Sequence, residues 1–226
     1  MTMYMQLIDE LNAKKEESFA RFQRKLIPTK QTILGVRTPT LRAIAKKYAG
    51  EVEKVFAFPD EFYEVTFIKL TIVSMLPYEK FVLYIEECVD LIDNWATCDS
   101  FKPKCIRENR DSFLPILERI FEKGGEFQQR YPLVALLYEY IDERYLPVIR
   151  THIQKADTKL YYVKTAVAWL VAELLAQRYE DGIALLNENF LDEKTRNKAI
   201  QKAIESYRID TGRKEYLRSL KINRTR

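Results

Sequence analysis

Two tryptophans and one aspartate are the residues of this chain whose types and spacing could do chemistry. Trp95 and Asp99 lie four positions apart in a polar segment between two apolar stretches, so they share one face if that segment is helical. Asp99 and Ser100 could instead cap the next helix, which accounts for the aspartate but not for the tryptophan. Trp169 lies in an apolar helical stretch, where a large aromatic ring is more often core than site.

The composition leaves little room for metal or thiol chemistry. His152 is the only histidine, which excludes most histidine-rich metal sites. Cys88, Cys98 and Cys105 form no CxxC pair and no secretory signal begins at Met1, so we expect reduced thiols in a cytoplasmic protein. No run approaches the roughly 18 apolar residues that span a bilayer.

The net charge of +4 is unevenly distributed along the chain. Residues 14–47 hold 10 basic and 2 acidic side chains, and residues 194–226 hold 11 basic and 3 acidic ones. The middle, residues 48–193, holds 16 basic and 26 acidic side chains. Two basic ends could clamp the phosphates of a polyanion, or they could be solvated faces of helices.

The elements that must position these residues are helices almost throughout. Only 6 Gly and 8 Pro are present, which argues against a turn-rich all-β fold. Apolar spacing predicts one long helix or a helix pair over Met3–Leu26, a helix capped by Thr38 with Pro39 at its first position, and a helix over Asp60–Met75. Further helices are predicted at Tyr78–Ile92, Asp99–Arg107, Arg110–Glu122, Phe127–Tyr140, Tyr145–Lys155, Leu160–Gln177, Asp181–Asn187, Glu193–Ser206 and Arg213–Leu220.

A basic residue recurs near the start of successive apolar helices. The residues are Lys69, Lys104, Arg130, Lys164 and Lys198, separated by 35, 26, 34 and 34 positions. Helical-pair repeats have periods of roughly 34–47 residues, and stacking them would align these residues in one row. The 26-residue step breaks the period, so chance placement is the alternative. No Pro- or Gly-rich linker interrupts the chain, which favours a single domain over residues 1–226.

Several short motifs occur together in an order that resembles the AlkD family of DNA alkylation-repair glycosylases. They are Gly35-Val-Arg-Thr-Pro39, Leu41-Arg42, Trp95-x-x-x-Asp99-Ser100, Gln129-Arg130, Lys164-x-x-x-x-Trp169 and Lys198-x-x-x-Lys202-x-Ile204. Each motif is weak alone, whereas the ordered set covers nearly the whole chain and is fairly specific. The resemblance implies an all-α solenoid of HEAT-like repeats with a concave basic groove for duplex DNA.

The resemblance also implies a reaction. It is the hydrolysis of the N-glycosidic bond of cationic N3- or N7-alkylated purines in double-stranded DNA, by a monofunctional glycosylase. Trp95 and Trp169 would be aromatic walls at the lesion, because an aromatic face attracts a cation. Asp99 would stabilise the charge that develops at the sugar C1′, and Arg130 would hold a phosphate. DNA-binding roles follow for Arg37, Arg42, Lys104, Lys164, Lys198 and Lys202.

A binding role without chemistry is the second hypothesis. Phe22 stands where the family pattern has a tyrosine, and Ala-Thr-Cys follows Trp95 where a more acidic stretch is expected. A catalytically weak or inactive paralogue could then act as a DNA- or protein-binding module. In either case the resemblance implies no metal and no organic cofactor. We expect no membrane partner, and we expect a monomer in a bacterial-type cytoplasm, associated with the nucleoid when bound to DNA.

Overall fold

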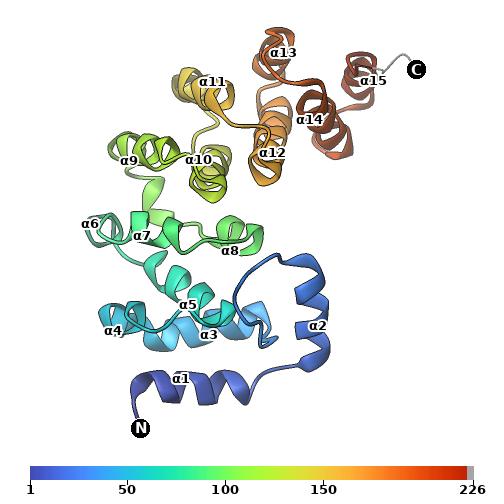
Figure 1. The fold of residues 1–226 in the computed structure, drawn as a ribbon. Coiled ribbons are helices and arrows are strands. Elements are labelled where there is room, and N and C mark those ends of the chain that lie inside the picture. The colour runs from blue at the N-terminus through green and yellow to red at the C-terminus, as the bar shows by residue number, and fades with distance from the viewer. Residues whose placement is uncertain (223–226) are drawn as a thin grey trace. The chain divides into compact units, whose positions relative to one another are not determined.

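The computed structural model describes residues 1–222, and helices make up its regular structure (Figure 1). The predicted all-α, helical-repeat fold is confirmed. The chain forms two compact units, Met1–Asn109 and Arg110–Arg226, which are described separately below. The single-domain assignment stays a prediction.

The N-terminal unit is built around one largely buried helix. Its helices are α1 (Met3–Asn12), α2 (Glu17–Leu26), α3 (Thr38–Tyr48), α4 (Val52–Phe56), α5 (Tyr63–Val73), α6 (Tyr78–Phe81), α7 (Ile85–Asp90) and α8 (Trp95–Ser100). Residues 63–70 of α5 are all buried, because α3, α4, α7 and α8 all pack against this helix. The β-branched residues near Lys69 are therefore helical, as predicted.

The C-terminal unit is a stack of helix pairs. Its helices are α9 (Arg110–Glu122), α10 (Glu126–Glu139), α11 (Leu146–Lys155), α12 (Tyr161–Gln177), α13 (Tyr179–Asn187), α14 (Glu193–Glu205) and α15 (Thr211–Ser219). Helix α12 packs between α10 and α14, while α9 and α11 pack on α10, α13 on α12 and α15 on α14 (Figure 1). This pairing is what a period near 34 residues predicts for the second half of the chain.

Several predicted helices differ from the structure, and the one predicted over Tyr78–Ile92 is two helices, α6 and α7. Of the two alternatives for Met3–Leu26, the structure shows the helix pair, with a break at residues 13–16. Thr38 is the first helical residue rather than the cap, which is Arg37. The helix predicted over Asp99–Arg107 does not form: α8 ends at Ser100 and only a short 3-10 turn, Lys104–Ile106, follows. Pro103 is the reason, because it lacks an N–H and restricts the residue before it to extended backbone.

A buried carboxylate fixes the loop between α2 and α3. Glu64 on α5 is fully buried, and its two oxygens accept hydrogen bonds from the backbone N–H groups of Leu34 (3.1 Å), Gly35 (2.8 Å) and Val36 (3.3 Å). Burial raises the pKa of this carboxyl above its usual value, although the backbone donors act in the opposite direction. The loop that contains the Gly35 motif is thus tied to the central helix of its unit.

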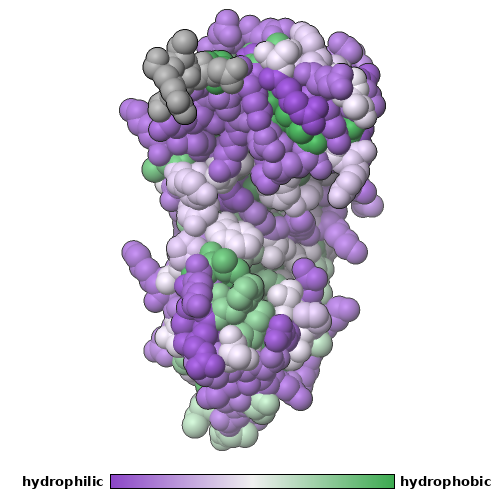
Figure 2. Space-filling model, turned by 90° about the vertical axis from the view of Figure 1, so that its right-hand side faces the viewer, coloured by the Kyte–Doolittle hydropathy of each residue, from purple (hydrophilic) through white to green (hydrophobic). Residues whose placement is uncertain are grey.

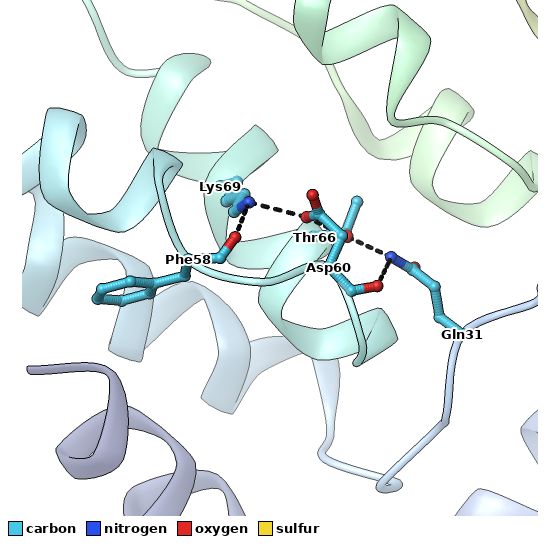
Figure 3. Close-up of polar contacts among 5 residues, drawn as sticks. All are labelled: Gln31, Phe58, Asp60, Thr66 and Lys69. Carbon is cyan, nitrogen blue, oxygen red and sulfur yellow. Dashed lines mark hydrogen bonds and ion pairs between the residues drawn. The ribbon is translucent and has the colours of Figure 1, made fainter.

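The predicted row of basic residues is wrong at Lys69, which is buried. Its side chain is 2 % exposed, and its ammonium group donates to the Phe58 carbonyl oxygen (2.6 Å) and to Asp60 Oδ1 (2.8 Å) (Figure 3). Gln31 and Thr66 extend the same network: Gln31 donates to Thr66 Oγ1 and to the Asp60 carbonyl. Lys69 is therefore an internal cation of the N-terminal unit, and it does not belong to a row of surface phosphate contacts.

Candidate active site and nucleic-acid interface

Helix α8 presents the candidate catalytic pair. Asn94 caps this helix by accepting a hydrogen bond from the Thr97 backbone N–H at 3.0 Å, so α8 begins at Trp95. Trp95 is 36 % exposed and Asp99, one turn later, is half-buried. The prediction that both residues share a helix face is confirmed, whereas Asp99 and Ser100 end α8 and do not cap a following helix.

The Trp95 ring is held by the end of α2. Its indole Nε1–H donates to the Leu26 carbonyl oxygen at 2.9 Å. Asp93 adds a second tie, because its Oδ2 accepts from the Thr29 hydroxyl (2.7 Å) and from the Lys30 backbone N–H (2.9 Å). Nothing in the local sequence pattern links these residues, which are more than 60 positions apart, so Asp93 was not among the predicted site residues. These hydrogen bonds fix α8 against the end of α2, so the two helices together form one surface of the N-terminal unit.

That surface of the N-terminal unit is both apolar and basic. Phe22 and Leu26 of α2 are exposed, and Arg21, Arg24 and Lys25 lie between and beside them. Figure 2 shows an apolar area bordered by hydrophilic side chains on the half of the molecule that holds this unit. Exposed apolar area rimmed by charge is typical of an interaction surface.

A basic pocket lies next to the end of α8. Its volume is about 850 Å³, and its walls come from α3, the end of α5 and the segment after α8. Four of the lining side chains are cations: Arg42, Lys46, Lys102 and Lys104. Two of them, Arg42 and Lys104, are predicted DNA-binding residues, and the structure brings them to the same pocket. Sequence reasoning missed Lys46 and Lys102, although the Lys102-Pro103-Lys104 spacing is visible in the chain.

Lys102 has an altered acid–base environment. Partial burial lowers the pKa of its ammonium group below the usual value, and the nearby positive charge of Arg42 lowers it further. The negative charge of Asp99 acts in the opposite direction. Asp99 and Lys102 are therefore electrostatically coupled, and the candidate carboxylate lies close to the basic pocket.

Arg37, also predicted to bind DNA, has an internal partner. Its guanidinium group pairs with Glu16 at 2.6 Å and lies over the Phe19 ring at 4.0 Å. The hydrogen bonds between the two side chains raise the pKa of Arg37 and lower that of Glu16. Arg37 is exposed, so a phosphate contact stays a prediction, but its charge is largely matched by Glu16.

In the C-terminal unit, Arg130 joins two helices. The side chain is 5 % exposed and donates from Nη1 to the Tyr162 carbonyl (2.7 Å) and to Thr165 Oγ1 (2.9 Å). These contacts connect α10 to the first turns of α12. That Arg130 also binds a DNA phosphate stays a prediction. To do so, its guanidinium group would have to bind the phosphate while keeping its hydrogen bonds to Tyr162 and Thr165.

Trp169 and three lysines complete the predicted residues of this unit. Trp169 is half-buried on α12 and packs edge-to-face on Tyr138, with ring centroids 5.5 Å apart. Lys198 is half-buried, with its ammonium 5.3 Å from the Tyr161 ring centroid, and Lys202 is exposed and paired with Glu205. Lys164 is half-buried on α12, five residues before Trp169. Trp169 is thus neither wholly core nor wholly surface, and its role stays a prediction.

The structure thus groups the predicted site residues by unit. The N-terminal unit holds Trp95, Asp99, Arg37, Arg42 and Lys104, whereas the C-terminal unit holds Arg130, Lys164, Trp169, Lys198 and Lys202. In residues 1–222, no helix is long and apolar enough to cross a membrane. Within the same range, no group of three or more His, Cys, Asp or Glu side chains is placed to hold a metal ion.

The fold is that of a helical-repeat protein. Its N-terminal unit carries a tryptophan and a carboxylate on one helix face and a pocket lined by cations, which are side chains that suit binding of a polyanion. The chain matches the family model of the DNA alkylation repair enzymes over residues 5–207, and it therefore belongs to that family. No curated protein matches it. The resemblance found in the sequence motifs is confirmed, and the chain is an enzyme of DNA repair.

Proposed function

We propose that this protein is a DNA glycosylase that hydrolyses the N-glycosidic bond of cationic N3- or N7-alkylated purines in double-stranded DNA. The observation that carries the proposal is the pairing of the Trp95 ring with the Asp99 carboxylate on one face of α8, in a chain that belongs to the DNA alkylation repair enzymes. A base that already bears a positive charge leaves as a neutral molecule. The enzyme therefore needs charge stabilisation at the sugar more than it needs a strong acid.

The two residues of α8 would divide the work. The Trp95 face would attract the cationic base, an interaction worth about 0.5–2 kcal/mol depending on how much water is removed. As the glycosidic bond lengthens, C1′ gains positive charge, which the Asp99 carboxylate would stabilise while orienting the attacking water. The hydrogen bond from Trp95 to Leu26 would fix the ring before the substrate arrives, which lowers the cost of ordering it on binding.

The test is release of methylated bases by Asp99→Asn and by the unchanged protein. Duplex DNA treated with a methylating agent is incubated with each, and free 3-methyladenine and 7-methylguanine are measured. We expect Asp99→Asn to lose about 100-fold to 1000-fold in the rate of release, which is typical for removal of one charge-stabilising group. Glu108→Gln, at an exposed carboxylate of the same unit, is the matched control and should keep full activity.

Failure of the glycosylase proposal would take one of two forms. Either the unchanged protein binds duplex DNA without releasing base above background, or Asp99→Asn releases base as fast as the unchanged protein. The first result would favour the second candidate, a DNA-binding module, for which the four cations of the basic pocket are the supporting observation.

Salt dependence would then separate a DNA-binding module from a protein-binding one. The logarithm of the DNA affinity should fall linearly with the logarithm of salt concentration, with a slope set by the number of neutralised phosphates. A protein-binding scaffold would show little duplex affinity at any salt concentration.

A further inference from the structure

The basic pocket of the N-terminal unit holds a lysine that base release does not use. Lys102 lies between Phe101 and Pro103, which are both buried, so the backbone that carries its side chain is fixed. Its amine lines the pocket with Arg42, Lys46 and Lys104. Lys102 is exposed, but partial burial of its amine together with the charge of Arg42 lowers the pKa of its ammonium group, while Asp99 opposes that change. A lowered pKa raises the fraction of neutral amine, which is the nucleophilic form.

The other lining groups suit a phosphodiester rather than a small neutral ligand. Arg42, Lys46 and Lys104 bring three further positive charges to the walls, and Ser100 and Ser74 bring hydroxyl groups. Cations and hydroxyls are the usual protein contacts of DNA phosphates. A deoxyribose in a strand has one phosphate on its 5′ side and one on its 3′ side, so a sugar held at Lys102 would have cations available for both.

Asp99 connects this pocket to the site proposed for base release. It lies three residues before Lys102, and its charge is felt at the Lys102 amine. Removal of a base leaves an abasic sugar, whose ring-opened form carries an aldehyde at C1′. The product of the first reaction would thus appear next to a nucleophilic amine.

We propose that Lys102 forms an imine with the C1′ aldehyde of an abasic site and that the protein thereby cleaves the DNA strand by β-elimination. This activity differs from the monofunctional glycosylase that the family resemblance implies. It rests on the proposed function only in taking DNA as the substrate.

The chemistry balances without an added reagent. The neutral amine attacks the C1′ carbonyl carbon, and loss of one water gives a protonated imine. A base, for which the Asp99 carboxylate is the nearest candidate on the chain, takes a proton from C2′. The C2′–H electron pair forms a C2′–C3′ double bond, and the C3′–O bond breaks to release the 3′ phosphate as the 5′ end of the downstream strand. Hydrolysis of the imine by one water then frees the lysine and leaves an unsaturated aldehyde on the upstream strand.

Cys105 is the other nucleophilic side chain in the pocket, and it is the weaker candidate. Burial raises the pKa of its thiol to about 11, so the reactive thiolate is scarce at neutral pH. A thiol also forms no imine, so reductive trapping distinguishes the two nucleophiles.

Borohydride trapping on a preformed abasic site is the test. A duplex containing uracil is converted to an abasic duplex beforehand, so the measurement does not depend on base release by this protein. Borohydride reduces the imine to a stable amine and links protein to DNA in a complex that survives denaturing gel electrophoresis. We expect the unchanged protein to form this complex and, without borohydride, to cleave the strand on the 3′ side of the abasic sugar.

Two variants make the outcome specific to Lys102. Lys102→Arg keeps the positive charge but forms no imine, so the trapped fraction should fall at least 20-fold. Lys80→Arg, the matched change at an exposed lysine of the same unit that does not line the pocket, should trap like the unchanged protein. The trapping rate of the unchanged protein should rise with pH, as a larger fraction of the amine loses its proton.

Two outcomes would overturn the proposal. One is the absence of a trapped complex with the unchanged protein, whether or not it binds the abasic duplex. The other is trapping by Lys102→Arg at the level of the unchanged protein, which would place the reacting amine elsewhere. Since the substrate is already abasic, neither outcome bears on whether the protein releases alkylated bases.

Discussion

Replacing Gly35 by alanine adds one methyl group to the loop between α2 and α3. The resulting loss of stability should measure how tightly this loop is packed. The φ of Gly35 is +88°, a backbone conformation that side chains of L-residues rarely adopt. A Cβ placed there would lie 2.5 Å from the Glu16 carbonyl oxygen and 2.6 Å from the Ala20 backbone nitrogen. Both contacts are with backbone atoms, which cannot rotate away, so Gly35→Ala combines conformational strain with a steric clash.

The expected cost can be built from these two parts. A left-handed conformation costs an L-residue about 1–2 kcal/mol, and over-packing typically costs about 1–3 kcal/mol. Gly35→Ala should therefore lower the free energy of unfolding of the N-terminal unit by about 2–5 kcal/mol. This is a large part of the marginal stability of a typical domain, which is about 5–15 kcal/mol.

Two other glycines separate the cost of conformational strain from the cost of the steric clash. Gly124 has a φ of +79° but open space where its Cβ would be, so Gly124→Ala should show strain alone, about 1–2 kcal/mol. Gly50 has open space and no positive φ, so Gly50→Ala should be neutral or stabilise by up to about 1 kcal/mol.

Urea unfolding followed by tryptophan fluorescence is the assay, because each unit contains one tryptophan. A Trp169→Phe background leaves Trp95 to report on the N-terminal unit, which contains Gly35 and Gly50. The converse background, Trp95→Phe, reports on the unit that contains Gly124. The reasoning is refuted if Gly35→Ala costs no more than Gly124→Ala, since the clash would then contribute nothing.

Three further predictions concern buried ionisable groups. Glu64→Gln should destabilise the N-terminal unit by about 1–3 kcal/mol in urea, because glutamine keeps only one acceptor oxygen and the amide N–H₂ that replaces the other faces a backbone N–H. Lys69→Met should cost about 1–3 kcal/mol in the same assay, since the Asp60 carboxylate loses its 2.8 Å partner. Burial lowers the pKa of His152 below 6.5, so the unfolded chain takes up the proton first, and the free energy of unfolding should fall between about pH 7.5 and pH 5.5 by more than it does in His152→Gln.

Each of these predictions has a control and a contrary outcome. Glu61→Gln, at an exposed carboxylate near Glu64 in the sequence, should change stability little, and an equal loss in both variants would contradict the role given to the buried oxygens. Lys80→Met, at an exposed lysine, is the control for Lys69→Met and should change stability little. An equal loss in both variants would contradict the role given to the buried ammonium group. For His152, equal pH dependence with and without the imidazole would show that other groups carry the effect.

The sequence predicted the helical fold well because apolar periodicity is a local property. The stacked pairs of the C-terminal unit and the shared face of Trp95 and Asp99 both follow from the 3.6-residue repeat of a helix. The prediction over Asp99–Arg107 was wrong because apolar residues continue past Ser100 while Pro103 interrupts the backbone, and periodicity alone does not weigh that interruption.

The fate of the charged residues was less predictable, since it depends on partners distant in the sequence. Lys69 is internal because the loop before α5 returns Phe58 and Asp60 to it, and the apolar stretch around Lys69 gives no sign of that. Arg130 is bound to residues 32 and 35 positions later, across two helices. A regular spacing of basic residues therefore identified repeats, but it did not separate surface cations from internal ones.

The carboxylate of Glu64 also decides what the Gly35 motif can be used for. Three consecutive backbone amides of this loop donate to that side chain, so none of them is left to hold an external phosphate. The motif is therefore a signature of how the first helices of the chain are assembled. A protein could lose its catalytic residues and still keep this motif, so finding it in another sequence identifies a shared architecture and says nothing about whether that protein repairs DNA.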